Sequence, residues 1–526
     1  MTAPNTQLFR YFLMLTTTLC GGLVMVVEVL GARVIGPYFG VSLFVWTALI
    51  TVTLTALSIG YALGGMLADR RPAPQWLYGL IVVSGLLVML VPVLKPFVIQ
   101  ATVPLGLRVG ALVSATLLFA PSLLLLGCVS PYVVRIATSE WARLGRTVGV
   151  LYALSTIGSM VGTALAGYVI IAFIGVSGAF LLCGSLLVLL GLSYFLFFRR
   201  QLAALPGVAG LALLLWLPPA ELPTAVTSDG TQVRLVESHD GFYGSVKVVE
   251  YNGTAYQTRE LLIDGLIQGG IDQKTGASTY EYAYLLEALP LAVKPDTRSA
   301  LIVGLGAGVL SKRLQDRGID VEAIDIDPLV VQMAEKHFNL QMKRPVVIED
   351  ARYFLAQEGQ RYDMIVMDAF TGDATPSHLL SREALERVKA RLAPDGVVGM
   401  NIIGSTNNNS RFIAAVIRTL QTQFSDIAMF PLFDMQGGKE TEGNLVLIAA
   451  NRPLDATFSA IPQHVHPLAK ELIALALRQG KKLPTQTNGL ILTDDFNPLD
   501  VLDIELHENV RRNIMTTTPA NILLHG

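Results

Sequence analysis

Long runs of apolar residues fill most of the first 220 positions of this chain of 526 residues. A helix needs roughly 20 such residues to cross a bilayer. Six runs approach or exceed that length, and a shorter seventh candidate follows; they cover residues 12–34, 43–68, 77–94, 109–128, 148–174, 176–198 and 205–217. We therefore expect residues 1–220 to form an N-terminal α-helical membrane bundle, a multi-span transmembrane domain of six to eight spans.

The pattern changes after residue 220 to short alternating strands and then to a helix. Residues 233–236, 245–249 and 261–263 alternate between apolar and polar positions, and residues 264–268 close this segment. Alternation bounded by turn residues is typical of antiparallel strands. A helical stretch over residues 278–289 follows and ends before Pro290. The sequence thus predicts a small antiparallel β subdomain and a helix within residues 225–295.

Residues 301–327 have the order of a nucleotide-binding βαβ unit. An apolar run, a glycine cluster, a helical stretch over 309–317 and a second apolar run ending in acids follow one another. Two more strands, at 346–348 and 362–367, and a helix at 381–392 continue the pattern. We predict an α/β Rossmann-like catalytic core over residues 296–452, followed by a C-terminal extension over residues 453–526.

Acidic residues stand at the carboxyl ends of three successive predicted strands. They are Asp325, Asp350 and Asp368, and open α/β sheets bind their ligands at this edge. An acid after the second strand suits ribose hydroxyls, and a carboxylate at position 350 suits the exocyclic amine of an adenine. A dinucleotide fingerprint needs its third glycine at position 309, which is Val309. An S-adenosyl-type ligand therefore fits this pattern better than NAD does.

Charge differs between the two parts of the chain. Residues 1–220 hold 11 Lys and Arg against 3 Asp and Glu, whereas the remainder holds 28 against 38. The second part is therefore acidic, and we expect no nucleic-acid partner. All three cysteines, Cys20, Cys128 and Cys183, lie in the apolar part. Their positions predict neither a disulfide framework nor a metal site.

An ordered set of short motifs in the soluble part resembles one enzyme family. The set comprises Asp264-Gly265 with Gln268, Tyr282 with Pro290-Leu291, the glycine turn, Asp325-Ile326-Asp327, Glu349-Asp350-Ala351, Asp368 and Ser381-Arg382-Glu383. It is similar to that of the spermidine synthases, the polyamine aminopropyltransferases. The apolar part, with Gly31-Ala32-Arg33 and residues 37–40 and 45–47, resembles the membrane-fused branch of that family.

The resemblance implies a membrane-bound enzyme that moves an aminopropyl group from decarboxylated S-adenosylmethionine to a diamine such as putrescine, releasing methylthioadenosine. A carboxylate can take the proton of the attacking amine, and by resemblance Asp368 is this catalytic base. The implied S-adenosyl-binding residues are Gly304, Gly306, Gly308, Asp325, Asp350 and Ala351. The implied residues for the small-molecule amine are Gln268, Tyr282 and Asp373. The family's chemistry implies no metal.

Several positions at the amine end depart from the family pattern. The family's glycine turn usually contains an aspartate that holds the aminopropyl amine, and here that position is Ala307. Ala283 and Tyr284 replace an expected His-Glu or Gln-Glu pair, and Asp373 stands one residue farther from Asp368. The nucleoside pocket is thus kept better than the polyamine pocket. Intact S-adenosylmethionine is the alternative co-substrate, and a methyltransferase or related transferase on a membrane-held amine is the alternative function.

Two features of the apolar part motivate a third interpretation. Glu28 lies within the first span with Arg33 five residues later. Ionisable groups inside a membrane often mark a pathway, although a structural ion pair explains these two equally well. Residues 64–71 are similar to a loop motif of major facilitator transporters. A polyamine transporter or sensor with a regulatory nucleotide domain is therefore a further alternative.

Basic residues near the apolar runs favour a cytoplasmic N-terminus. Seven full spans would then place the soluble part outside, away from cytosolic S-adenosyl compounds. Either residues 205–217 do not cross, or residues 97–108 add a crossing, or the charge pattern misleads. We expect a multi-pass protein of the cell inner membrane, embedded in the lipid bilayer, with its catalytic domain in the cytoplasm. A homodimer is compatible with this sequence.

Asp494 and Asp495 form a compact acidic turn just before Pro498. Acidic turns are usually only solvated. A diamine, however, brings two positive charges, and their burial requires paired carboxylates. We hypothesise that Asp494 or Asp495 folds back over the strand ends and supplies the negative charge that Ala307 does not.

Overall fold

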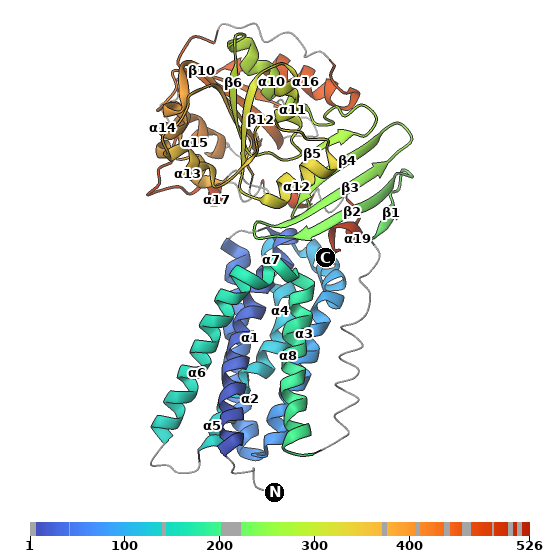
Figure 1. Cartoon of the computed structure of the whole chain (residues 1–526), viewed down its shortest axis with the longest axis vertical. Helices are drawn as coiled ribbons and strands as arrows, with labels where there is room; N and C mark the ends of the chain where they lie inside the picture. Colours follow the sequence, from blue (N-terminus) through green and yellow to red (C-terminus); the bar gives the residue numbers. More distant parts are fainter. Residues whose placement is uncertain are drawn as a thin grey trace. The chain divides into compact units, whose positions relative to one another are not determined.

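The computed structural model of the chain describes residues 7–40, 43–138, 144–200, 222–370, 376–405, 411–435, 442–454, 464–485, 489–502, 506, 509–512 and 518–525. The chain divides into two compact units. One comprises residues 1–221 with 240–242 and 523–526, and the other comprises residues 222–239 and 243–522. Long helices make up the first unit, whereas the second contains two sheets and their covering helices (Figure 1).

The helices of the first unit are long and apolar. Their bounds are α1 Gln7–Phe39, α2 Leu43–Arg70, α3 Pro74–Thr102, α4 Leu107–Gly127, α5 Val129–Ala137, α6 Leu144–Leu165, α7 Ile171–Ile174 and α8 Val176–Phe197. Within the described ranges, six helical stretches are long and apolar enough to cross a membrane, and they correspond to the six longer predicted runs.

The two other candidate crossings have different outcomes. Residues 97–108 do not form a helix of their own. They comprise the end of α3, the 3-10 turn Val103–Leu105 and the start of α4. Residues 205–217, the seventh candidate, lie outside the described residues.

Glycines bring α1 and α6 into close contact. A Cβ atom added at Gly158 would lie 2.0 Å from the carbonyl oxygen of Thr18, and one at Gly162 would lie 2.4 Å from that of Gly22. These separations are far below van der Waals contact, so a larger residue at either position would push the helices apart. Small residues spaced four apart serve this purpose in membrane bundles.

The charged residues of the first unit that the sequence analysis names have separate surroundings. Glu28 and Arg33 both lie in α1, and no ion pair joins them in the described part of the chain. Asp69, within the transporter-like segment of residues 64–71, accepts a hydrogen bond from Arg135 Nε at 3.2 Å. This contact links the end of α2 to α5.

The smaller sheet contains five strands in chain order. They are β1 Thr224–Val226, β2 Gln232–Asp240, β3 Ser245–Asn252, β4 Gln257–Ile263 and β5 Leu266–Asp272. Asp264 and Gly265 join β4 to β5 with φ values of +48° and +81°, as a two-residue hairpin turn of type I′ requires. The prediction that residues 264–268 close the β subdomain is wrong, because a further strand, β5, begins at Leu266. Gln268 lies on this strand.

The helix after this sheet, α10, spans Glu281–Val293. The expected helix of residues 278–289 is wrong at both ends, because α10 begins three residues later and continues through Pro290. Pro290 is buried and packs against the sheet, where its Cγ lies 3.3 Å from the position that a Cβ on Gly399 would occupy. This packing compensates for the hydrogen bond that a proline removes from a helix interior.

The larger sheet has eight strands in the order β13-β11-β12-β10-β9-β6-β7-β8. Their bounds are β6 Ser299–Val303, β7 Asp320–Asp325, β8 Val347–Ile348, β9 Tyr362–Met367, β10 Leu392–Ser405, β11 Asp426–Pro431, β12 Glu442–Ala450 and β13 Lys481–Lys482. Strands β6 to β10 pair in parallel. The chain runs outward from β6 through β8 and then returns to β9 on the other side of β6. A topological switch point therefore lies between β6 and β9, as in Rossmann-like folds.

Helices cover both faces of this sheet (Figure 1). Besides α10, they include α11 Val309–Asp316, α12 Pro328–His337, α13 Ala351–Ala356, α14 Arg382–Ala390, α15 Arg411–Leu420 and α16 Pro467–Gln479. Successive residues of β6 belong to the hydrophobic cores on opposite faces of the sheet. Ala300 and Ile302 share a core with α11, α12 and α16. Leu301 and Val303 share the other core with α13, α14 and α15. A strand buried on both faces needs a continuous apolar run, and residues 300–303 provide one.

Candidate active site

A cavity of about 320 Å³ opens at the carboxyl ends of the parallel strands. Its volume is near the lower end of the range typical of small-molecule sites. Residues from the switch point, the small sheet and α10 contribute to its wall. Among the residues that line the cavity are Gln268, Tyr280, Tyr282, Gly304, Gly306, Asp325, Asp350, Ala351, Asp368, His378 and Asn401.

The glycine turn after β6 has a backbone that only glycine adopts easily. Gly304, Gly306 and Gly308 have φ values of +90°, +53° and +72°. A Cβ atom at Gly304 would lie 2.2 Å from the carbonyl oxygen of Asp368, and one at Gly306 would lie 2.5 Å from that of Gln268. Gly304 and Gly306 line the cavity, whereas Gly308 caps α11 and does not. Gly308 thus shapes the turn from outside the cavity wall.

Asp325, at the end of β7, is held by the backbone of two turns. Its Oδ2 accepts the N–H of Leu305 and its Oδ1 accepts that of Asp327, both at 2.9 Å. Burial raises the pKa of Asp325 to about 6, and these hydrogen bonds oppose the rise. The side chain lines the cavity beside the glycine turn. Its remaining lone pairs can accept hydrogen bonds from the hydroxyl groups of a bound ribose.

Asp350 caps α13 and faces a histidine. Its Oδ1 accepts the backbone N–H groups of Arg352 at 2.8 Å and Tyr353 at 3.1 Å. Its Oδ2 lies 3.3 Å from Nε2 of His378. Asp350, the adjacent Ala351 and His378 all line the cavity. The capping bonds fix the direction of the carboxylate, so Oδ2 is the oxygen that an adenine amine can reach.

Asp368 follows β9 at the switch point. Its Oδ1 accepts a hydrogen bond from Nδ2 of Asn401 at 2.9 Å. Burial raises the pKa of Asp368 to about 7, and the Asn401 hydrogen bond opposes this rise. A carboxylate with a pKa near neutrality is well suited to act as a general base at physiological pH.

Asn401, which the sequence analysis does not name, is a polar residue within the buried strand β10. Only 1% of its surface is exposed, and it lines the cavity. Its Oδ1 has no hydrogen-bond partner in the described part of the chain. Buried polar atoms nearly always have a partner, so an N–H donor of a bound molecule would complete the pair. The signal in the sequence was a single amide among the apolar residues 397–403.

The opposite wall carries two tyrosines from the start of α10. The Tyr282 hydroxyl donates to the backbone oxygen of Gln268 at 3.3 Å. Burial, followed by the charge of Asp368, raises the pKa of Tyr282 well above its usual value, so its hydroxyl remains a donor. Tyr280, a second residue that sequence reasoning missed, hydrogen bonds to Glu260, and burial raises the pKa of that carboxyl to about 7.

Of the positions Ala307 and Asp373 at the amine end, the structure describes only Ala307. Ala307 is 3% exposed, and its Cβ lies 3.2 Å from the position that a Cβ on Gly269 would occupy. Ala307 therefore packs closely against β5, and it is not one of the residues that line the cavity. Asp373 lies outside the described residues. Within the described ranges, no group of three or more His, Cys, Asp or Glu is placed to hold a metal ion.

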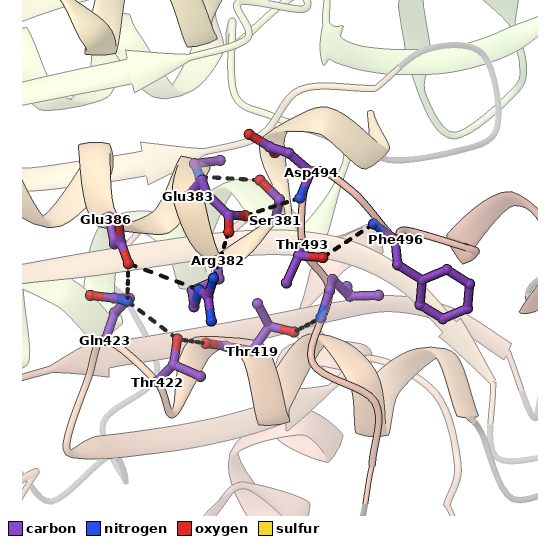
Figure 2. Close-up of polar contacts among 12 residues, drawn as sticks. Ser381, Arg382, Glu383, Glu386, Thr419, Thr422, Gln423, Thr493, Asp494 and Phe496 are labelled. Carbon is purple, nitrogen blue, oxygen red and sulfur yellow. Dashed lines mark hydrogen bonds and ion pairs between the residues drawn. The ribbon is translucent and has the colours of Figure 1, made fainter.

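The acidic turn of the tail lies elsewhere. Asp494 forms an ion pair with Arg352 of α13, and its backbone N–H donates to Glu383 Oε2 at 3.0 Å (Figure 2). Asp495 is exposed, and neither acid lines the cavity. The hypothesis that they supply charge to the amine is therefore wrong. The reason is electrostatic, because the Arg352 cation at the surface attracts the nearer carboxylate.

Several known proteins are similar to the part of the chain that carries most of this cavity. The spermine/spermidine synthase domain matches residues 280–435. The polyamine aminopropyltransferase of Vibrio vulnificus is 26% identical over 219 residues, which make up 40% of this chain and 72% of that protein. The N-terminal histidine N-methyltransferase of Emericella nidulans is 36% identical over 137 residues, 25% of this chain and 24% of that protein.

Among solved structures, the spermidine synthase of Thermotoga maritima overlaps with a TM-score of 0.37 and 14% identity, covering 50% of this chain and 92% of that chain. Residues 280–435 match the spermine/spermidine synthase domain, and this match together with the polyamine aminopropyltransferase relatives indicates that the chain is a transferase.

Proposed function

We propose that the soluble domain transfers an aminopropyl group from decarboxylated S-adenosylmethionine to a small amine such as putrescine, releasing methylthioadenosine. The observation that carries this proposal is the buried pair of Asp368 and Asn401. It combines a carboxylate whose pKa is about 7 with an unpartnered amide oxygen at the switch point of the sheet. An amine nucleophile needs one acceptor for the proton that it loses and a second for a proton that it keeps.

The nucleoside end of the cavity suits the thioadenosine part of the donor. Asp325 would accept the ribose hydroxyls. Asp350 Oδ2 would accept the exocyclic amine of adenine, with Ala351 beside the ring. Gly304 and Gly306 would pass beneath the sulfur, because their missing side chains leave room for close approach of the backbone.

The reaction itself requires one proton transfer. An amine with a pKa near 10 is protonated at neutral pH, and the lone pair must be free for attack. In the proposed step, the amine nitrogen forms a bond to the propyl carbon attached to the sulfonium. The carbon–sulfur bond breaks, and its electron pair neutralises the sulfur. The proton lost by the amine goes to the free oxygen of Asp368.

The acceptor amine would lie between the two strand ends and α10. Gln268 and Tyr282 line the cavity on that side, and we propose that they bind the chain of the amine. Asp373 would take a second ammonium group if the acceptor is a diamine. The charge of Asp368 attracts a cationic acceptor before its deprotonation.

Methyl transfer from S-adenosylmethionine is the second candidate, and a specific observation favours it. Ala307 is buried in the glycine turn, so no carboxylate stands there to hold an aminopropyl ammonium group. The same base could deprotonate an amine that attacks a methyl carbon. The released product would then be S-adenosylhomocysteine.

We further propose that the six apolar stretches cross the cell inner membrane and that the catalytic domain is cytoplasmic. An even number of crossings returns the chain to the side of its N-terminus, where cytosolic S-adenosyl compounds are available. The length and composition of the six stretches support this arrangement. A homodimer remains a prediction.

The test is product identification with the full-length protein in detergent. Each S-adenosyl donor is offered with a panel of diamines and monoamines, and the products are separated by mass spectrometry. Methylthioadenosine with an aminopropylated amine is the expected result. S-adenosylhomocysteine with a methylated amine would replace the first proposal by the second, and neither product with any amine would refute both.

A further inference from the structure

A short piece of the C-terminal tail contacts the nucleoside end of the cavity from outside. Residues 489–502, here called the tail segment, contribute no side chain to the cavity wall. They contact three elements that do contribute to it or lie next to it, namely α13, the 3-10 turn Ser377–Leu379 and the start of α14. The assignment of this end of the cavity to adenosine rests on the proposed function.

The contact with α13 is an ion pair. Asp494 pairs with the guanidinium of Arg352, in the first turn of α13. The same guanidinium donates to the carbonyl oxygen of His378 at 2.5 Å and to Oγ of Ser381 at 2.8 Å. Arg352 therefore connects three chain segments. One of them begins after Asp350, whose Oδ2 lies 3.3 Å from Nε2 of His378 and whose side chain lines the cavity.

The contact with the 3-10 turn is a hydrogen bond. Asn497 Nδ2 donates to the carbonyl oxygen of Ser377 at 2.7 Å. His378 and Leu379, the next two residues, line the cavity. The position of this turn sets how near His378 lies to Asp350, and the tail segment holds the turn at its first residue.

Backbone bonds anchor the tail segment itself. The N–H of Arg382 donates to the carbonyl oxygen of Leu492 at 2.8 Å, and the N–H of Leu492 donates to Oγ1 of Thr419 at 2.9 Å. The bond from Asp494 to Glu383 joins this set (Figure 2). These hydrogen bonds attach the tail segment to α14 and α15.

The Asp494–Arg352 pair is partly exposed, with 47% and 25% of the side chains accessible. The Arg352 guanidinium and the Ser381 hydroxyl hold the pKa of Asp494 below its usual range, so the carboxylate is ionised at neutral pH. Exposed pairs contribute little to overall stability. The consequence of this pair is therefore local, through the order of the segments that Arg352 joins.

We propose that Asp494, acting through Arg352, is a positioning residue for adenosine binding. It orders the start of α13 and the turn at His378, and it has no part in binding the amine. Loss of the carboxylate removes one of the three contacts that hold the Arg352 guanidinium, which loosens the turn and lets His378 shift against Asp350. The ligand must then order these segments, so its affinity falls while the chemistry at Asp368 continues.

The experiment compares two neighbouring acids in the full-length protein in detergent. Asp494→Asn and Asp495→Asn remove the same charge from adjacent positions, and only Asp494 reaches Arg352. Calorimetry measures the Kd for methylthioadenosine, and steady-state kinetics measure KM for the amine. We expect Asp494→Asn to raise the Kd on the order of fivefold or more, within the usual range of coupling between sites, with an unchanged amine KM. Asp495→Asn should match the wild type.

Two more variants separate positioning from a general loss of structure. Asp494→Glu keeps the charge and should restore most of the affinity. Arg352→Ala should weaken binding, and adding Asp494→Asn to it should cause little further loss, because the two residues act through one contact. Melting temperatures monitor folding throughout.

The outcomes are distinct. Wild-type protein that fails to bind methylthioadenosine would refute the proposed function, and this inference with it. Wild-type protein that binds, with an Asp494→Asn variant of equal affinity, would refute the inference alone. A rise in the amine KM with an unchanged Kd would also refute the inference, because Asp494 would then not act on adenosine binding.

Discussion

Asn401 and Asp368 are joined across the neighbouring parallel strands β10 and β9, with 2.9 Å between Asn401 Nδ2 and Asp368 Oδ1. This bond occupies one oxygen of the carboxylate and fixes the orientation of the carboxylate plane, and thereby the position of the other oxygen. It also offsets part of the rise in the pKa of Asp368 that burial causes. The geometry of the proposed base therefore depends on a residue 33 positions later in the chain.

Replacement of the proposed base should separate chemistry from nucleoside binding. Asp368→Asn keeps the volume of the side chain but removes the proton acceptor. We expect transfer to slow by about 10²- to 10⁴-fold, the usual contribution of a general base. The Kd for methylthioadenosine should stay within about twofold, as measured by calorimetry. Turnover equal to that of the wild type would remove Asp368 from the mechanism.

The pH profile should reveal two different acids. Asp368 must be ionised to accept a proton, and because burial raises its pKa to about 7, kcat/KM should fall as the pH drops below 7. A bound cationic amine favours the carboxylate, so the limb in kcat should lie at lower pH. Binding of methylthioadenosine should weaken only near pH 6, where Asp325 becomes protonated. A single limb shared by both measurements would contradict these assignments.

Removal of the Asn401 amide should affect the base and the amine together. Asn401→Leu deletes the hydrogen bond to Asp368, so the pKa of Asp368 should rise further and the acid limb of kcat/KM should move upward. The loss of one charge-assisted bond, about 1.5–3 kcal/mol, predicts a fall in kcat/KM of about tenfold or more at pH 7. Asn444→Leu, on the neighbouring strand of the same cavity wall, is the matched control and should keep the wild-type limb.

A side chain at Gly304, the first glycine after β6, should lower the free energy of unfolding more than one at a glycine with open space around it. Gly304→Ala combines a positive φ with a Cβ placed 2.2 Å from a backbone oxygen, whereas Gly318 has a similar φ of +84° with nothing within 4 Å. Gly318→Ala should therefore show only the left-handed backbone cost of about 1–2 kcal/mol. Denaturant unfolding should show a clearly larger loss for Gly304→Ala. Equal losses would mean that the close approach to Asp368 does not matter.

Glycines of α6 should differ according to whether they face α1. A Cβ on Gly158 would lie 2.0 Å from a backbone oxygen, whereas nothing lies within 4 Å of Gly149 on the same helix. Gly158→Ala should lower the melting temperature of the full-length protein in detergent, and Gly149→Ala should leave it nearly unchanged. A melting temperature that is unaffected in both variants would contradict the close packing of α1 and α6.

Local patterns in the sequence determined most element types. The strand predicted at 362–367 coincides with β9, because the consecutive apolar residues 364–367 are typical of a buried parallel strand. The predicted helix at 381–392 is right in place but too long, since Ser381 is the cap of α14 and Leu392 already begins β10. The acids at strand ends could be located for the same reason, because parallel strands bring their carboxyl ends to one edge.

Tertiary structure alone decided which side chains meet there. Nothing local shows that Asn401 points at Asp368, because their contact depends on the register of β10 against β9. Nothing local shows that Asp494 turns to Arg352, 142 residues earlier in the chain. An apolar run or a capping residue is recognised by neighbours within a few positions, whereas a long-range pair is set by the packing of whole elements. The sequence alone therefore determined the edge of the sheet at which a ligand would bind, and the fold decided which residues hold the base and the nucleoside end in place.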